Sequence, residues 1–351
     1  MARPRSTGTG DNRRITIIDL ADKLGVSPTT ISRALRSKGG MSEETRDRIR
    51  KAAELHGYVP NKAGAALSTG RVFSIGYIVP KDARGYPSQL QADVMRGLVE
   101  ELAKSGYSLT VYSEDYFLAE GTSLLEAGHK IRADALVVTI EHSDPVAPPA
   151  QPLPLPLMVV NRRLEGIDAD FILADEERGG LLAVDHLLGL GHRGIAFVGG
   201  PSDHAAMARR REGYADALAE AGIAYDADLV EHRDEFSWQA GHAACAALLD
   251  RAGGRFTGIF CGSDILAFGV LKCLEERGLA VPGDIAVASF DDSMFADIAD
   301  PALTSVRKPR YAMGQYAARR LIQRLDNDAA PGEIVLPVEL IVRASSTSRR
   351  D

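Results

Sequence analysis

The chain has 351 residues, of which 45% are hydrophobic and 25% are charged, and this composition excludes wholesale disorder and a fibrous repeat. No apolar run of about 18 residues occurs and no apolar stretch follows the arginines at the start, so neither a membrane span nor a secretory signal is expected. The net charge of −7 combines +7 on residues 1–71 with −14 on the remaining 280 residues, which restricts contact with a polyanion to the basic N-terminal region.

The basic region is expected to begin with a disordered tail over residues 1–14, because this segment has almost no apolar content. Thr16 and Asp19 then have the three-residue spacing of a capping box, and apolar residues follow at helical spacing as far as Leu24. Gly25 suits the left-handed position at which helices end. The pattern predicts a short first helix.

A second helix is expected three residues later, because Ser27 is a good N-cap and Pro28 is favoured at the first helical position. Two short helices joined across a glycine form a helix-turn-helix. Ser42 begins a third helix that completes a compact unit. We therefore expect a DNA-binding domain over residues 15–60.

In a helix-turn-helix, the N-terminal residues of the second helix meet base edges in the DNA major groove. Arg33, one turn into that helix, can pair bidentately with guanine, while hydroxyl and amide side chains bind phosphates and set the register. The alternative is a three-helix protein-binding module in which Arg33 is only solvated. The candidate DNA-contacting residues from this pattern are Thr16, Ser27, Pro28, Thr29, Thr30, Ser32, Arg33 and Asn61.

Beyond Gly70, apolar strands alternate with amphipathic helices, a pattern typical of parallel sheets covered on both faces. The number of units exceeds what one compact sheet usually holds, so two α/β lobes are expected. The strands are predicted at 73–79, 108–112, 135–139, 157–160, 195–198, 258–261 and 285–290. The helices are predicted at 89–104, 178–190, 208–221, 238–250, 265–277 and 309–325.

Polar and aromatic residues gather near the predicted strand ends, where ligands bind in open α/β sheets. Carboxylates, an amide, guanidinium groups and aromatic rings together suit a hydroxyl-rich molecule such as a sugar, although aromatic rings also hold purines. Asp175 and Asp264 have an alternative role as helix caps. The candidate effector-binding residues are Asp82, Asn161, Arg162, Asp175, His204, Arg210, Phe236, Trp238, Asp264 and Asp291.

Motifs of enzymes and metal sites do not support a catalytic assignment. The sequence contains no G-x-S-x-G elbow, Walker loop, H-E-x-x-H or C-x-x-C pattern. The three cysteines, Cys245, Cys261 and Cys273, lack metal-ligand spacing and are expected to be buried and reduced. We expect no enzymatic activity, no cofactor and no metal.

Several segments resemble the LacI/GalR family of bacterial transcription regulators, in order and spacing, from Ile15 to Ser346. The resemblance implies a helix-turn-helix, a short hinge helix and a two-lobed effector core similar to periplasmic binding proteins. In the head, the matching segments are 16–21 (TIIDLA), 25–27 (GVS), 30–35 (TISRAL), 45–46 (TR) and 57–61 (GYVPN). In the body, they are 190–196 (LGHRGIA), 211–214 (REGY), 290–292 (FDD) and 301–306 (PALTSV).

The resemblance also implies domain limits. The hinge helix and linker would span residues 61–71, with Leu67 as the residue that enters the minor groove and kinks DNA. The effector-binding and dimerisation core would span residues 72–351. Its first lobe would comprise about 72–173 and 306–334, and its second lobe about 174–305 and 335–346.

The resemblance further assigns roles to residues that the pattern had already marked. Pro28, Thr29 and Arg33 would occupy the base-reading positions. The effector positions would fall on Asp175, His204, Arg210, Phe236 and Asp291.

The expected function is therefore a cytoplasmic DNA-binding regulator, in the first instance a repressor, whose affinity for a palindromic operator is controlled by a small molecule, in the first instance a sugar. A purine- or nucleoside-responsive regulator and a solute-binding protein are the alternatives. A homodimer is expected, joined through a helix and a loop. The candidate interface residues are Leu90, Val94, Leu98 and Leu102 on the helix and Met294, Phe295 and Ile298 on the loop. The alternative is that these apolar residues only face their own sheet.

Overall fold

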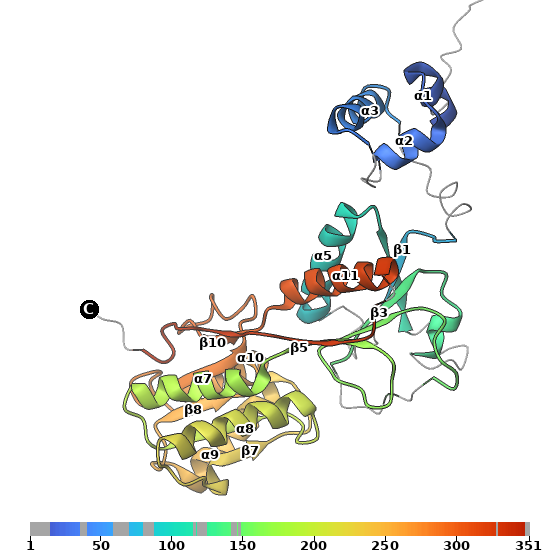
Figure 1. The fold of residues 1–351 in the computed structure, drawn as a ribbon. Coiled ribbons are helices and arrows are strands. Elements are labelled where there is room, and N and C mark those ends of the chain that lie inside the picture. Colours follow the sequence, from blue (N-terminus) through green and yellow to red (C-terminus); the bar gives the residue numbers. More distant parts are fainter. Residues whose placement is uncertain are drawn as a thin grey trace, which may run out of the picture. The chain divides into compact units, whose positions relative to one another are not determined.

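The computed structural model describes residues 15–35, 41–58, 70–79, 88–114, 117, 125–141, 146, 149–327 and 329–347. The chain divides into two compact units, residues 1–72 and residues 73–351, which are called the head and the core (Figure 1). Within the described ranges, no helix is long and apolar enough to cross a membrane.

The head is built from α1 (Ile17–Leu24), α2 (Pro28–Leu35) and α3 (Glu43–Leu55). The capping box of Thr16 and Asp19 is confirmed, and Gly25 ends α1 in the left-handed conformation, with φ of 64°. Leu20, Ile31 and Ile49, one from each helix, are fully buried against one another. The helix-turn-helix is therefore held by local caps and a small shared core.

The core contains two six-stranded sheets, each largely parallel, and each sheet defines a lobe. Lobe 1 has the strand order β11-β5-β4-β3-β1-β2, and all of its neighbouring strands are parallel. Its strands are β1 (Ser74–Val79), β2 (Ser108–Ser113), β3 (Ala135–Thr139), β4 (Leu157–Val160), β5 (Asp170–Ala174) and β11 (Glu333–Leu336). Its helices are α5 (Gln89–Lys104), α11 (Arg310–Asn327) and the short η1 (Glu126–His129).

Lobe 2 has the strand order β12-β10-β9-β8-β6-β7, in which only β12 runs antiparallel to its neighbour. Its strands are β6 (Ile195–Gly199), β7 (Val230–His232), β8 (Gly258–Cys261), β9 (Ala286–Asp291), β10 (Thr304–Arg307) and β12 (Glu339–Ile341). Its helices are α7 (Glu176–Gly189), α8 (Ala205–Glu220), α9 (Trp238–Ala252), α10 (Asp264–Glu276) and the short η2 (Ala227–Leu229).

Both faces of each sheet are covered, which explains why the central strands read as continuous apolar runs. In lobe 2, α7 and α8 pack on one face with Phe197, while α9 and α10 pack on the other with Val198. In lobe 1, α5 and α11 cover the face that carries Tyr77 and Val137. The three cysteines are buried and unpaired in lobe 2. The prediction of two doubly covered α/β lobes is confirmed.

Neighbouring helices approach at glycines that leave no room for a methyl group. A Cβ at Gly97 of α5 would lie 2.2 Å from the carbonyl oxygen of Tyr311 in α11. A Cβ at Gly269 of α10 would lie 1.9 Å from the carbonyl oxygen of Trp238 in α9. Such contacts fix each helix pair at close range. The other glycines in these crossings are Gly180 and Gly213 between α7 and α8, Gly241 between α9 and α10, and Gly314 between α11 and α5.

The predicted interface role of the four apolar residues of the helix 89–104 is wrong, and the alternative, that they face their own sheet, is confirmed. Leu90, Val94, Leu98 and Leu102 are all buried in the core of their own lobe, where α5 packs against the sheet and α11. The loop after β9 differs, because Met294, Phe295 and Ile298 are 67%, 54% and 74% exposed. That loop is the part of the predicted interface that the fold leaves uncovered.

Candidate DNA-binding face and effector cleft

The head presents a polar face on α2. Residues 28, 29, 32 and 33 share that face by helical spacing, while Ile31 and Ala34 are buried on the opposite side. Pro28, Thr29 and Arg33 are exposed. The structure therefore brings the predicted base-reading side chains together on one surface of one helix.

Two of the predicted phosphate-binding hydroxyls already cap helices. The Thr16 hydroxyl donates to Asp19 at 2.7 Å and accepts from the Asp19 backbone N–H. The Ser27 hydroxyl accepts from the Thr30 backbone N–H at 3.1 Å and also contacts the Thr30 hydroxyl. These side chains hold the start of each helix. Asn61, Leu67 and Asp82 lie outside the described residues, so their predicted roles stay predictions.

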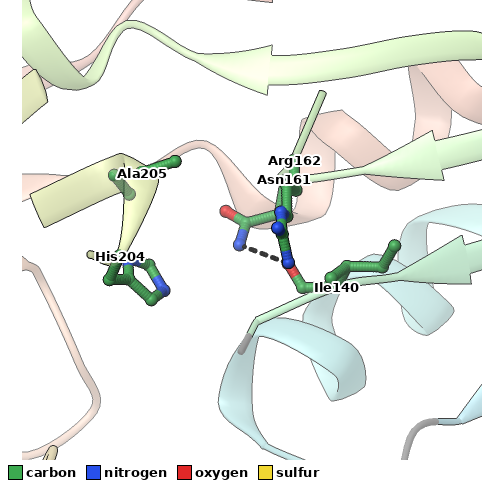
Figure 2. Close-up of a pocket in the computed structure, with 6 residues that line it drawn as sticks. Ile140, Asn161, Arg162, His204 and Ala205 are labelled. Atoms are coloured by element: carbon green, nitrogen blue, oxygen red, sulfur yellow. Dashed lines mark hydrogen bonds between the residues drawn. The ribbon is translucent and has the colours of Figure 1, made fainter. Parts of the chain in front are cut away.

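A small pocket lies between the lobes of the core, lined by residues that follow strands of lobe 1 and by the start of α8 in lobe 2. Figure 2 shows His204 at the start of α8 facing Asn161 and Ile140 of lobe 1 across this space. Arg162 lines the same pocket. Three of the predicted effector residues, Asn161, Arg162 and His204, therefore meet in one place.

A buried ionic cluster adjoins this pocket. The Arg210 guanidinium is almost fully buried and donates to Glu176 at 2.7 Å and to the carbonyl oxygen of Gly262. Its carbon lies 3.6 Å from the centre of the Phe290 ring, a cation–π contact. The Lys308 ammonium donates to the other Glu176 oxygen at 2.7 Å and to the side-chain carbonyl of Asn161. Lys308 therefore bridges the end of β4 in lobe 1 and the start of α7 in lobe 2.

Glu176 is ionised in this cluster. Burial acts to raise the pKa of its carboxyl, but the charges and hydrogen bonds of Arg210 and Lys308 outweigh burial and lower the pKa to about 2. The Glu176 carboxylate thus pairs with two buried cations.

His204 makes a second contact between the lobes. Its Nε2 donates to the carbonyl oxygen of Glu141 at 2.6 Å, and its Nδ1 accepts from the backbone N–H of Met207 as the N-cap of α8. Burial lowers the pKa of His204, so the ring is neutral at pH 7. The ring also meets the edge of Phe236, with centroids 5.1 Å apart. Phe236 in turn lies against Gly200, where a Cβ would be 2.5 Å from its ring.

Asp291 ends β9 beside this cluster. Its carboxylate lies 3.6 Å from the Arg210 guanidinium and its side chain is 31% exposed. Its backbone has a φ of 118°, in the region that non-glycine residues rarely adopt. A partly exposed carboxylate next to a fixed guanidinium can accept hydrogen bonds from a ligand while the guanidinium donates.

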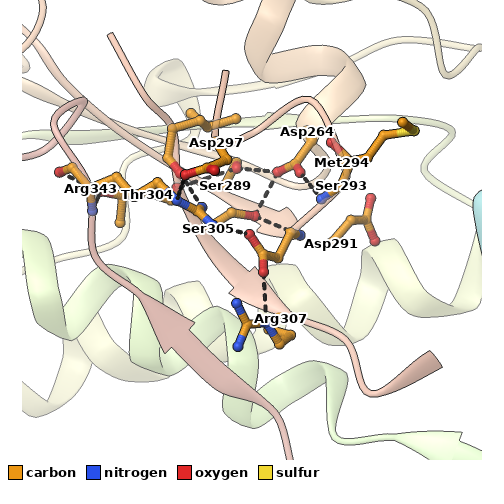
Figure 3. A network of polar contacts seen from close by, with 12 residues as sticks. Asp264, Ser289, Asp291, Ser293, Met294, Asp297, Thr304, Ser305, Arg307 and Arg343 are labelled. Carbon is orange, nitrogen blue, oxygen red and sulfur yellow. Dashed lines mark hydrogen bonds and ion pairs between the residues drawn. The ribbon is translucent and has the colours of Figure 1, made fainter. Parts of the chain in front are cut away.

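Asp264 lies deeper than Asp291 and is only 1% exposed. It accepts hydrogen bonds from the hydroxyls of Ser289 and Ser305 and from the Ser293 backbone N–H (Figure 3). Burial and the charge of Asp291 raise the pKa of Asp264 to about 6 despite these bonds. Through these hydrogen bonds, Asp264 holds the end of β9 and the neighbouring strand β10 in place.

Two other predicted residues take different places. Asp175 is the N-cap of α7 and accepts from the Arg178 backbone N–H at 3.1 Å, which is the capping alternative. Trp238 begins α9 and is 48% exposed. Among the described residues, it forms no hydrogen bond or ring contact with Arg210 or Asp291.

Sequence reasoning missed Glu176 and Lys308. Glu176 follows Asp175 directly, and its pairing depends on a helix more than 30 residues away in the chain. Lys308 follows β10, a strand that was not predicted. The Ser263 hydroxyl, next to Gly262, is buried without a hydrogen-bond partner in the described part of the chain.

Two family models match the chain. The model for bacterial regulatory proteins of the lacI family matches residues 16–61, which lie within the head. The model for periplasmic binding protein-like domains matches residues 184–346, which include most of lobe 2 and end beyond the last strand.

Relatives and solved structures match over a longer range. The chain is 32% identical over 346 residues to the HTH-type transcriptional regulator CelR of Thermobifida fusca, covering 95% of this chain and 98% of that protein. A solved CelR–cellobiose complex is 30% identical with a TM-score of 0.68, covering 95% of this chain and 100% of that one. A LacI family regulator from Enterococcus faecium with bound ribose is 28% identical with a TM-score of 0.63, covering 78% of this chain and 98% of that one.

Proposed function

The chain belongs to the lacI family of bacterial regulatory proteins and is a DNA-binding transcriptional regulator, and we propose that it represses transcription under the control of a small carbohydrate held between its two lobes. The observation that carries the proposal is the polar cleft at the lobe boundary. There Asn161, Arg162 and His204 line a small pocket, and Arg210 of the adjoining ionic cluster lies 3.6 Å from the partly exposed carboxylate of Asp291.

DNA recognition is assigned to α2. Arg33 is exposed on the same face as Pro28 and Thr29, and the caps of α1 and α2 hold this face in place without DNA. The proline offers shape and apolar contact, for example with a thymine methyl, whereas the arginine can read guanine.

We expect DNA selected by the full-length protein from a randomised library to be an inverted repeat. Arg33→Ala should weaken binding to that DNA by about 1–3 kcal/mol and relax one base position in each half-site. Fluorescence anisotropy on single-base variants of the site measures both effects.

Lys23→Ala, a change at an exposed residue of the last turn of α1, is the matched control and should leave the base preference unchanged. Uniform weakening on all sequences by Arg33→Ala would contradict base reading by this residue.

A homodimer is proposed to produce this two-fold symmetry. The support is the exposed apolar loop with Met294, Phe295 and Ile298, because a two-fold interface uses the same patch on both subunits. Selection of a single asymmetric half-site would contradict the dimer.

The effector is proposed to be a neutral polyol. Arg210 and Lys308 are balanced by Glu176 and Asp291, so the cluster needs no further charge from a ligand. The relatives whose structures hold cellobiose and ribose add support.

We expect calorimetry of the full-length protein against sugars, beginning with cellobiose and ribose, to reveal a ligand. Asp291→Asn should weaken its binding at least about tenfold, because a carboxylate acceptor is worth about 1.5–3 kcal/mol. Circular dichroism checks that the fold is unchanged.

Asp297→Asn is the control, since Asp297 is an exposed carboxylate on the following loop. A parallel panel of nucleobases and nucleosides distinguishes the alternative. Binding of bases alone would replace the carbohydrate proposal with a purine-responsive regulator of the same architecture.

A further inference from the structure

Arg310 is a buried charged residue at the junction of the two lobes. It is the first residue of α11 in lobe 1 and is 8% exposed, yet its guanidinium reaches the end of β9 in lobe 2. It donates to the carbonyl oxygen of Asp291 and, at 3.0 Å, to that of Asp292. Its Nε donates to Asp93 of α5 at 3.1 Å. One side chain thus connects a strand end of lobe 2 to both helices that cover lobe 1.

The backbone that Arg310 contacts is unusual. Asp291 and Asp292 have φ values of 118° and 47°, which non-glycine residues adopt only when their surroundings hold them. The carboxylate of Asp292 is held by Arg307 and Arg343, each at 2.7 Å. The two carbonyl groups converge on the Arg310 guanidinium, so a rotation of either peptide plane changes its hydrogen bonds.

Asp291 has two functions in this arrangement. Its partly exposed carboxylate lies 3.6 Å from the Arg210 guanidinium, beside which the proposed effector binds. Its carbonyl faces Arg310. A ligand that draws the carboxylate therefore also displaces the carbonyl, because both belong to one residue at the end of a strand.

Lobe 1 can transmit such a displacement because α5 and α11 are tightly joined. Gly97 of α5 meets the backbone of Tyr311, and Gly314 of α11 meets the backbone of Val94, in each case with no space for a Cβ. A contact that pulls on the first residue of α11 and on Asp93 therefore acts on both helices together.

We propose that Arg310 is a positioning residue that couples occupancy of the cleft to the position of α5, and through it to DNA affinity. It does not touch the effector and acts through the main chain of Asp291. The proposal rests on the proposed effector control, and the experiment separates the two.

The first measurement is the dissociation constant for the selected inverted repeat with and without saturating cellobiose, for wild type, Arg310→Met and Arg310→Lys. Arg319→Met is the matched control, because Arg319 also lies on α11 and pairs with Glu101 of α5 at 3.8 Å, but it is half exposed and remote from the strand end. The ratio of the two constants reports coupling.

Arg310→Met should reduce that ratio at least about fivefold towards unity, while cellobiose affinity by calorimetry changes less than about threefold. Arg310→Lys should restore part of the ratio, and Arg319→Met should leave it unchanged. An unchanged ratio in Arg310→Met overturns the proposal. A wild-type protein whose DNA affinity responds to no sugar of the panel overturns the proposed function instead.

The second measurement needs no sugar. Amide hydrogen exchange over residues 89–96 of the full-length protein is compared for wild type, Asp291→Asn, Arg310→Met and the double variant. Asp291→Asn removes the carboxylate charge opposite Arg210 and should accelerate exchange in this part of α5 at least about fivefold. In the Arg310→Met background the same change should have no effect. Equal acceleration in both backgrounds, or none in either, overturns the coupling whatever the effector is.

Discussion

Replacing Arg210 with methionine is expected to lower the free energy of unfolding of the core by about 3–5 kcal/mol at pH 7, the cost of breaking a buried ion pair by removal of one partner. The guanidinium is almost completely buried and donates to Glu176 and to the Gly262 carbonyl. Its removal leaves the Glu176 carboxylate with Lys308 as its one cationic partner among the residues that the structure describes. Urea unfolding followed by circular dichroism measures the loss.

The loss of unfolding free energy in Arg210→Met should decrease as the pH falls. The pKa of Glu176 is about 2 in the folded protein, below its ordinary value of 4.5, so its ionisation stabilises the fold above pH 4.5. This contribution is lost as the pH falls from 4.5 towards 2. The difference in stability between wild type and Arg210→Met should therefore narrow over that interval.

Arg209→Met is the control for this experiment. Arg209 is the preceding residue of α8 and pairs with Glu177 and Glu212, but its side chain is 60% exposed. Exposed ion pairs contribute about 0–1 kcal/mol. Equal effects of the two substitutions would show that burial of the Arg210 pair does not determine its importance.

The second large effect concerns Gly269, where alanine should destabilise the core by about 3 kcal/mol, the upper end of the usual cost of overpacking, because the new methyl group meets backbone atoms. The new Cβ would lie 1.9 Å from the carbonyl oxygen of Trp238 and 2.5 Å from the backbone nitrogen of His242. Helix propensity alone predicts the opposite effect, an increase in stability of about 1 kcal/mol, because alanine favours a helix more than glycine does. Thermal unfolding followed by circular dichroism decides between them.

Gly189 provides the matched control. It lies at the end of α7, and a Cβ there would have nothing within 4 Å. Gly189→Ala should leave stability unchanged or raise it by up to about 1 kcal/mol. Gly269→Ala with wild-type stability would mean that α9 and α10 can separate freely.

The sequence predicted the head well because its signals are local. Thr16, Asp19 and Gly25 act within a single turn of helix, and the structure has the capping box and the left-handed glycine that they indicate. Most of the inner strands were also predictable, since burial on both faces produces uninterrupted apolar runs, but β5 and β10, which lie inside their sheets, were missed. The predicted helix limits fell within a few residues of the observed ones, because helix caps are also local signals.

The short edge strands and parts of the cleft were not predictable in this way. β12 has three residues and β11 has four, too few to show a period, and they are strands because of the partners they pair with. The ion pairs of Glu176 join residues 34 and 132 positions apart in the chain. The Arg210 pair depends on the packing of α7 against α8, and the Lys308 pair depends on the crossing of the chain between lobes. No local pattern reports either.

That crossing has a consequence for biosynthesis. Lobe 1 receives its covering helix α11 and its edge strand β11 only after the strands and helices of lobe 2 up to β10 have been made. At about 5–20 residues per second, the ribosome needs on the order of ten seconds to travel from β5 to the start of α11. Throughout that interval, the nascent face around Val94 and Leu98 lacks its partner helix. During synthesis the head can therefore fold before the core is complete. Until α11 emerges, the apolar face of α5 is exposed and available to chaperones.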